Sequence, residues 1–186
     1  MRLFFAVGLG ESAFEGIAPV VERIPGRELL PMRWVRPATY HMTIRFLGDM
    51  EEKNLAALDS AGERAARRVN PFKASLGAPG VFPDRENPRV LWFGLKEGSD
   101  GMTALATAVN GELALAMALP DEERFHPHVT IGRTKSPLDA GATHDFMMLP
   151  GPDVSWPVRE LQLVESELTN EGARYRVRRA FPLAPA

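Results

Sequence analysis

Two short segments in opposite halves of the chain share the pattern His-x-Thr-Ile. They read His41-Met42-Thr43-Ile44 and His128-Val129-Thr130-Ile131, and each lies in a β-like run. Successive side chains of a strand point to opposite faces, so each histidine shares a face with the threonine two residues on. If the two halves of the chain are related by approximate two-fold symmetry, both His/Thr pairs can face one groove.

Two imidazoles and two hydroxyls on one groove suit in-line attack on a phosphodiester. A neutral histidine can take a proton from water while a protonated one gives a proton to the departing oxygen, and an ordinary pKa of about 6.5 allows both forms near neutral pH. The hydroxyls of Thr43 and Thr130 can donate to the non-bridging oxygens, and Arg133 can add positive charge. The symmetry of the pattern leaves open which histidine is the acid.

Other interpretations of these residues compete with catalysis. A single His-x-Thr segment on a strand usually reflects plain packing or surface exposure, and it is the second copy at a matching place that favours chemistry. His126 and His128 have metal-ligand spacing and could form a zinc triad with His144, but this leaves the segment at His41 unexplained. We therefore assign no role to His126 and expect His144 to lie at the surface.

The hydrophobic pattern predicts strands and helices in mixed order. Strands are expected over residues 3–9, 32–36, 41–47, 72–76, 90–95, 129–132, 158–165 and 175–181, the last two as a closing hairpin. Helices are expected over about 12–23, 51–69 and 99–119, with Ser12 as the first cap, and residues 138–148 are ambiguous between helix and loop. Mixed elements with hairpin-like pairs indicate an α+β fold with antiparallel sheets.

Charge and composition limit the function further. The formal net charge is −2, so an anionic substrate must be held by a local cluster of donors and not by the field of the whole molecule. The chain has no cysteine, which excludes disulfides, thiolate metal sites and a cysteine nucleophile, and fits a reducing compartment. The apolar run at residues 3–9 is too short for a signal peptide or a membrane span, and we expect a cytoplasmic protein without membrane contact.

The two motifs and their surroundings resemble the two-histidine phosphoesterases, and among these the bacterial RNA 2',3'-cyclic phosphodiesterases, also called 2'-5' RNA ligases. The resemblance rests on the segments 41–48 and 127–133, and it extends to the opening strand at 2–7, a central strand at 89–92 and the ending at 164–168, Tyr175 and 181–183. Gly132 stands where an alanine is usual, a small departure that leaves the motif intact.

The resemblance implies a single bilobal domain over residues 1–186, with antiparallel sheets and flanking helices around a central groove. It also implies hydrolysis of a 2',3'-cyclic phosphate on RNA or a nucleotide to a 2'-phosphomonoester, without a metal ion or other cofactor, by a protein that we expect to be a monomer. His41 matches the proton donor and His128 the proton acceptor of this family, and Thr43 and Thr130 match its phosphate-oxygen donors.

Contacts beyond the motifs are harder to infer from the sequence. We expect substrate contacts from Arg133, Arg45, Arg33 and Tyr40, and further phosphate or base contacts from Arg36 and Arg124. Possible stacking partners for a base are Trp34, Tyr40, Phe46, Phe82, Trp92 and Phe125, although aromatic residues on strands most often belong to the core. Arginines near the C-terminus usually mark a solvated strand face, and an RNA-contacting rim is the alternative for Arg174, Arg176, Arg178 and Arg179.

Two alternatives to simple hydrolysis remain open. Ligation of 2'-5' linkages would use the same residues, because hydrolysis and ligation share a transition state. A non-catalytic RNA or nucleotide binder could use the groove as a phosphate pocket, but it would not need two histidines in different protonation states.

Overall fold

The computed structural model describes residues 1–119, 125–169 and 172–184. The strands are β1 (Arg2–Gly8), β2 (Arg33–Trp34), β3 (His41–Asp49), β4 (Phe72–Phe82), β5 (Val90–Glu97), β6 (Val129–Arg133), β7 (Ser155–Val158), β8 (Glu160–Thr169) and β9 (Gly172–Pro182). The helices are α1 (Glu11–Glu22), α2 (Leu55–Ala66), α3 (Ser99–Met117) and α4 (Ala140–Met147). Short 3-10 turns cover Arg27–Leu29, Pro37–Thr39 and Glu52–Asn54.

The strands of the described residues form one curled sheet of nine strands, in the order β7-β4-β5-β6-β3-β1-β8-β9, with β2 pairing with β6. Every pair is antiparallel. The predicted α+β fold with antiparallel strands, flanking helices and a central groove is therefore confirmed, and its two halves join in a continuous sheet. The seam is narrow, because β3 and β6 pair through Met42 and Val129 alone.

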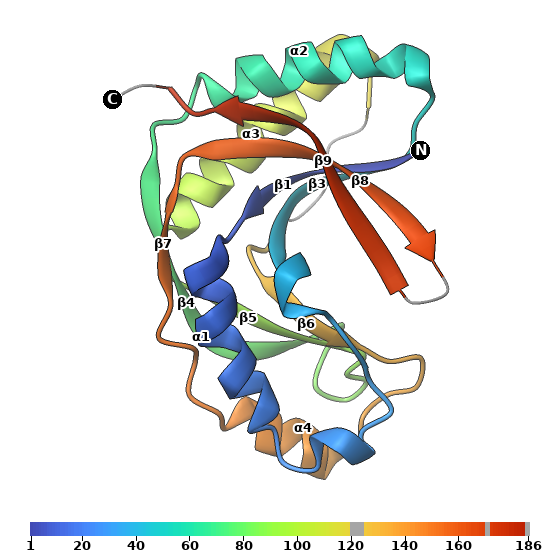
Figure 1. Ribbon diagram of the computed structural model, residues 1–186, viewed down its shortest axis with the longest axis vertical. Coiled ribbons are helices and arrows are strands. Elements are labelled where there is room, and N and C mark those ends of the chain that lie inside the picture. The colour runs from blue at the N-terminus through green and yellow to red at the C-terminus, as the bar shows by residue number, and fades with distance from the viewer. Residues whose placement is uncertain (120–124, 170–171, 185–186) are drawn as a thin grey trace.

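Helices cover each half of the sheet separately. Figure 1 shows α2 and α3 together at the top of the view and α4 at the bottom. Gly62 of α2 lies against the rings of Phe5 and Phe181, where a methyl group would already be too close, so the helix packs tightly on β1 and β9. In the other half, the ring of Phe146 in α4 packs on Phe93 in β5, with centroids 5.8 Å apart.

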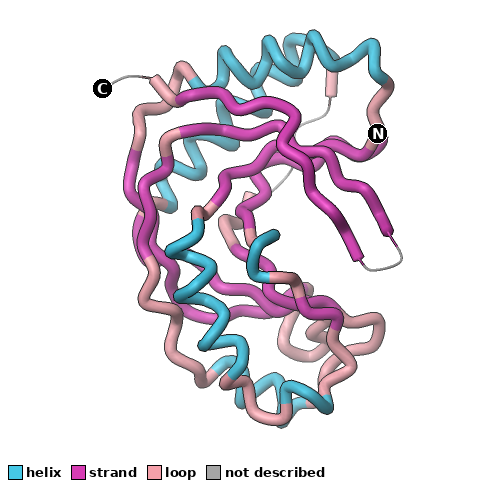
Figure 2. The backbone as a smooth tube through the Cα atoms, in the orientation of Figure 1, coloured by secondary structure: helices cyan, strands magenta, loops and turns pink. Residues whose placement is uncertain are grey.

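The first strand is buried on both faces, as its apolar run predicts. Leu3, Phe5 and Val7 belong to the main core, whereas Phe4 and Ala6 form a second cluster with Val164 on the opposite face. This second cluster forms because β8 lies beside β1 and continues into the β8–β9 hairpin, which extends away from α2 (Figures 1 and 2).

Several boundaries differ from the predicted ones. Helix α1 begins at Glu11 with Gly10 as its N-cap, so Ser12 is not the cap. The ambiguous region 138–148 contains α4, whose first turn is stabilised by the Asp139 carboxylate accepting from the backbone N–H of Ala142 at 2.9 Å. The closing hairpin is confirmed and is longer than predicted, since β8 and β9 pair along their whole lengths.

None of the helices in the described ranges is long and apolar enough to cross a membrane.

Candidate active site

The seam between β3 and β6 determines where the two motifs lie. Met42 is directly opposite Val129, and both side chains are completely buried in the core. Because adjacent residues of a strand point to opposite faces, the histidine and threonine on either side of each buried residue point together to the other face of the sheet. The two motifs therefore form one patch of four polar side chains.

The histidines occupy diagonal corners of this patch. In an antiparallel pair, the residues flanking Met42 and Val129 lie opposite each other, so His41 faces Thr130 and Thr43 faces His128. Diagonal neighbours in a sheet are about 7–8 Å apart at the backbone, a distance that long side chains can bridge. A group placed over the centre of the patch would have an imidazole on two sides and a hydroxyl on the other two.

Both imidazoles are oriented by a backbone carbonyl. Nδ1 of His41 lies 2.9 Å from the carbonyl oxygen of Thr39, and Nδ1 of His128 lies 2.7 Å from that of His126. A carbonyl oxygen can only accept, so Nδ1 must carry the proton in each ring. Nε2 is then the position that accepts or gives a proton, and the two hydrogen bonds prepare both histidines for the same chemistry.

Each histidine is also held between aromatic rings. The centroid of the His41 ring lies 4.9 Å from that of Phe4 and 4.9 Å from that of Tyr175. The His128 ring lies 5.0 Å from Phe82 and 5.9 Å from Trp92. These contacts restrict the rotation of both imidazole rings.

A cavity of about 560 Å³ opens over part of this patch. It is lined by His41, Thr43 and Thr130, and by four arginines, whereas no Asp or Glu appears among its described lining residues. The local positive charge that the net charge of −2 requires for an anionic substrate is therefore present. The arginines are Arg2, Arg33, Arg36 and Arg133.

The surroundings lower the pKa of both histidines. Burial lowers the pKa of His41, the hydrogen bond to Thr39 opposes this effect, and the charge of Arg133 adds to it. Burial likewise lowers the pKa of His128, against the hydrogen bond to the carbonyl of His126, and the positive charges of His126, Arg133 and His41 lower it further.

The other predicted contact residues separate into two groups. Arg133 lies in the cavity with its Nη2 3.4 Å from Oγ1 of Thr130, and Arg33 and Arg36 line the same cavity. Tyr40 is instead buried in the core, and burial raises its pKa to about 12. Arg45 is also buried, opposite Phe5 on the core side of β3, so neither residue is placed to contact a ligand in the cavity. Arg124 lies outside the described residues.

The alternative metal site lacks a ligand set. Within residues 1–119, 125–169 and 172–184, no three His, Cys, Asp or Glu side chains gather in a way that could hold a metal ion. His144 is exposed on α4, whereas His126 packs on Trp92 with ring centroids 4.7 Å apart. His126 thus belongs to the aromatic surroundings of His128.

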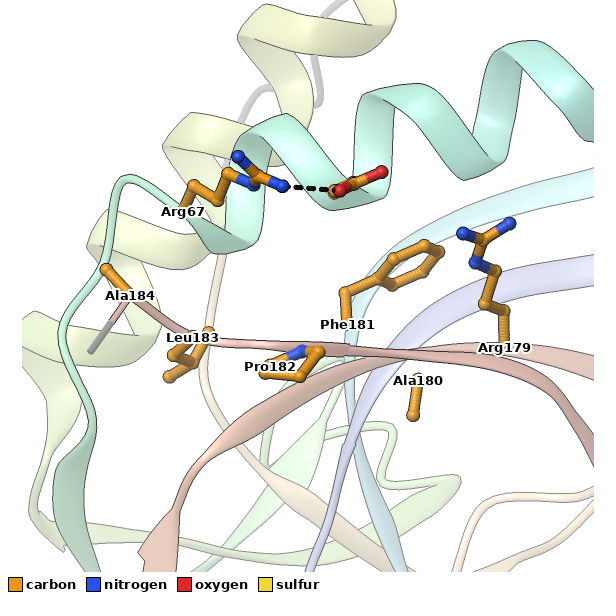
Figure 3. Close-up of a pocket in the computed structure, with 8 residues that line it drawn as sticks. Arg67, Arg179, Ala180, Phe181, Pro182, Leu183 and Ala184 are labelled. Carbon is orange, nitrogen blue, oxygen red and sulfur yellow. Dashed lines mark hydrogen bonds and ion pairs between the residues drawn. The ribbon is translucent and has the colours of Figure 1, made fainter.

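Arginines on the β8–β9 hairpin and beside α2 lie near carboxylates. On the β8–β9 hairpin, Arg174 lies opposite Glu167 and Arg176 opposite Glu165, as expected for a solvated strand face. A second cavity, of about 610 Å³, lies between α2 and the end of β9 (Figure 3). Its two arginines are paired with carboxylates, Arg67 with Glu63 at 2.7 Å and Arg179 with Asp59 at 3.1 Å.

Comparison with known proteins identifies the family of this chain. The sequence-family model of the 2'-5' RNA ligase superfamily matches residues 16–170. The chain belongs to this superfamily. It is 32% identical to the RNA 2',3'-cyclic phosphodiesterase of Archaeoglobus fulgidus, over 97% of this chain and 99% of that protein. It is 35% identical to the protein of the same name from Thermus thermophilus, over 98% of this chain and 90% of that protein.

Solved structures show the same fold. A crystal structure of a Thermus thermophilus protein superposes with a TM-score of 0.82 at 30% identity, covering 100% of this chain and 99% of that one. Escherichia coli LigT complexed with 3'-AMP superposes with a TM-score of 0.79 at 25% identity, covering 98% and 97% of the two chains. The paired motifs of this superfamily member therefore lie in a fold that its relatives share.

Sequence reasoning missed the aromatic pairs that hold the histidines. Phe4 and Tyr175 come from the first and last strands, and only strand pairing brings them to His41. Phe82 and Trp92 were expected as stacking partners for a base, and they contact His128 instead. Arg2 had no predicted role, because a single arginine at the start of a chain carries no distinguishing signal.

Proposed function

We propose that this protein hydrolyses a 2',3'-cyclic phosphate at the 3' end of RNA, or on a nucleotide, to a 2'-phosphomonoester. The observation that carries this proposal is the diagonal placement of His41 and His128 across the β3–β6 seam, each with Nδ1 bonded to a carbonyl. The curated relatives that match nearly the whole chain bear the name of this activity. A pocket that only binds phosphate would not need two histidines whose tautomers are both fixed by a backbone carbonyl.

The reaction requires one base and one acid on opposite sides of phosphorus. By resemblance to the superfamily, neutral His128 takes a proton from water through Nε2 as the water oxygen attacks phosphorus. The bond from phosphorus to the 3'-oxygen breaks, and protonated His41 gives its Nε2 proton to that oxygen. The product keeps the phosphate on the 2'-oxygen.

Charge on the non-bridging oxygens grows during this step. Thr43 and Thr130 can donate hydrogen bonds to these oxygens from the two remaining corners, and Arg133 is held near Thr130. Ligation of a 2'-5' linkage would be the same ring opening with a ribose 5'-hydroxyl in place of water, and it would use the same four side chains. No step in this scheme requires a metal ion.

The test is incubation of the purified protein with uridine 2',3'-cyclic phosphate in EDTA, with the product isomers separated by chromatography. We expect the 2'-phosphate. Formation of the 3'-phosphate, absence of product, or activity lost to EDTA and restored by zinc would each contradict the proposal.

Variants of the four corner residues test the assigned roles. General acid or base catalysis contributes about 10²–10⁴-fold, so His41→Ala and His128→Ala should each lower kcat by at least about 10²-fold. A hydrogen bond to a charged group is worth about 10–150-fold, so Thr43→Ala and Thr130→Ala should cost less. His144→Ala, at an exposed histidine on α4, is the matched control and should leave kcat unchanged.

A further inference from the structure

The two histidine motifs differ in the residue that supplies the carbonyl. Nδ1 of His41 donates to the carbonyl oxygen of Thr39 at 2.9 Å, and Nδ1 of His128 donates to that of His126 at 2.7 Å. A threonine carries no charge, whereas a histidine gains or loses its charge between about pH 5 and 8. The proposed reaction gives His41 and His128 opposite roles, so a difference in charge beside the two rings bears directly on it.

The backbone between His126 and His128 keeps their rings on one side. A proline restricts the residue before it to extended backbone, so Pro127 favours for His126 the geometry that a strand would give it. Side chains two residues apart on extended backbone point to the same face. The ring centroids of His126 and His128 accordingly lie 6.2 Å apart.

His126 and His128 also share their aromatic neighbours. Both rings contact Phe82 on β4 and Trp92 on β5, and the centroids of all pairs among these four rings lie between 4.7 and 6.2 Å apart. The indole of Trp92 rests directly on the backbone of β4, because a methyl group at Gly80 would lie 2.2 Å from its ring atoms. A change at His126 therefore reaches His128 through packing as well as through charge.

His128 has a charged neighbour that His41 lacks in the matching place. Burial lowers the pKa of His128 most, the hydrogen bond to the carbonyl of His126 opposes it, and the positive charges of His126, Arg133 and His41 lower it further. Arg133 lies on β6 and His41 on β3, whereas the rings that β4 and β5 place against His128 do not titrate. For His41, the charge that lowers the pKa is that of Arg133, and Thr39 adds none.

We propose that His126 is a positioning residue for His128: its ring packs beside that imidazole, and its positive charge keeps His128 neutral in acid, which makes His128 the base. This inference rests on the proposed function and adds to it the group that separates the roles of the two histidines. A cation beside an imidazole disfavours a second charge there, so His128 stays neutral to a lower pH than it would without His126. His126 is exposed, so it exchanges protons with solvent and not with the substrate.

The experiment follows the ring C–H resonances of the histidines by NMR as the pH is varied. The chain has four histidines, so each resonance can be assigned from single substitutions. The proteins are the wild type, His126→Ala, His126→Phe, and His144→Ala as the control at an exposed histidine on α4. Thermal melting, and kcat and kcat/KM for uridine 2',3'-cyclic phosphate over the same pH range, are measured in parallel.

We expect the pKa of His128 to rise in both variants of His126 and that of His41 to change less. His126→Ala should also lower kcat by about 2–10-fold, the value of one aromatic contact, and His126→Phe, which keeps a ring without a charge, should restore most of it at the alkaline end of the profile. As the pH falls, kcat/KM of His126→Phe should drop below that of the wild type, because more of the base is then protonated. His144→Ala should change none of these quantities.

Three outcomes would overturn the inference. The first is a pKa of His128 that is the same in His126→Phe as in the wild type. The second is an equal rise in the pKa of His41, which would mean that His126 does not separate the two roles. The third is an unchanged kcat in His126→Ala.

The titration does not depend on activity or on the most disruptive variant. If His126→Ala does not fold, His126→Phe keeps a ring in place and decides the effect of the charge on its own. A wild type that opens no cyclic phosphate contradicts the proposed function instead, whereas the effect of His126 on His128 is still measured without substrate.

Discussion

The carbonyls of Thr39 and His126 make the two histidines chemically similar, because each holds the Nδ1 proton and leaves Nε2 for the substrate. The same burial that excludes water around the rings also disfavours their charged forms. Burial, with Arg133 nearby, lowers the pKa of both histidines. The active form of the proposed enzyme nevertheless needs one neutral and one protonated imidazole, so pH must control its rate.

The pH dependence of kcat/KM should show this directly. A bell-shaped profile is centred midway between the two apparent pKa values of the acid and the base. Because both pKa values lie below the ordinary value, the maximum should fall below about pH 6.5. Steady-state kinetics with a cyclic nucleotide, which does not titrate in this range, measures the profile. A maximum above pH 6.5 would mean that the free enzyme does not depress these pKa values.

At the scale of elements, the strands bring together side chains that no local pattern connects. Tyr175 on β9 contacts both Phe4 on β1 and His41 on β3, so three strands contribute to one cluster of rings. Tyr175 also lines the cavity, where burial raises its pKa against the charges of Arg133 and Arg2. Its ring therefore contacts His41 at the wall of the cavity.

Removal of this ring should loosen His41 without removing the imidazole. An aromatic pair is worth about 0.5–1.5 kcal/mol beyond its buried area, so Tyr175→Leu should lower kcat by about 2–10-fold, and Tyr175→Phe should restore most of it. Val177→Ala, two residues further along β9 and half exposed, is the matched control. Equal kcat values for Tyr175→Leu and Val177→Ala would show that the ring does not position His41.

The sequence predicts the motifs well because their signal is local. A period of two places His41 with Thr43 and buries Met42, and the observed burial follows this pattern. The seam through Met42 and Val129 could not be predicted, since register depends on how the two halves of the sheet meet. Tyr40 shows that closeness in the sequence is not enough to predict a substrate contact. It is next to His41 in the chain, but its side chain packs in the core.

At the scale of the whole molecule, the charge that lines the cavity has the opposite sign to the net charge of the protein. The net charge is −2, yet the described lining of the cavity has four arginines and no carboxylate. On the outer face of β8 and β9, by contrast, arginines and glutamates lie opposite each other and their fields largely cancel. A substrate anion far from the protein meets weak repulsion, and one at the cavity meets attraction.

The sign of the salt effect on kcat/KM shows whether the net negative charge of the protein or the positive charge of the cavity controls substrate binding. Raising the ionic strength from about 0.01 M to about 1 M shortens the Debye length from about 30 Å to about 3 Å and screens exposed charges. If the arginines of the cavity control binding, kcat/KM for a dinucleotide that ends in a 2',3'-cyclic phosphate should fall as salt rises, and it should fall less steeply in the Arg33→Gln variant, which removes one of these arginines. Stopped assays at fixed pH over this range measure the slope, with sucrose added in place of salt as a control for general solvent effects. A rise of kcat/KM with salt would mean that the net negative charge dominates the encounter and that the arginines of the cavity contribute little to binding.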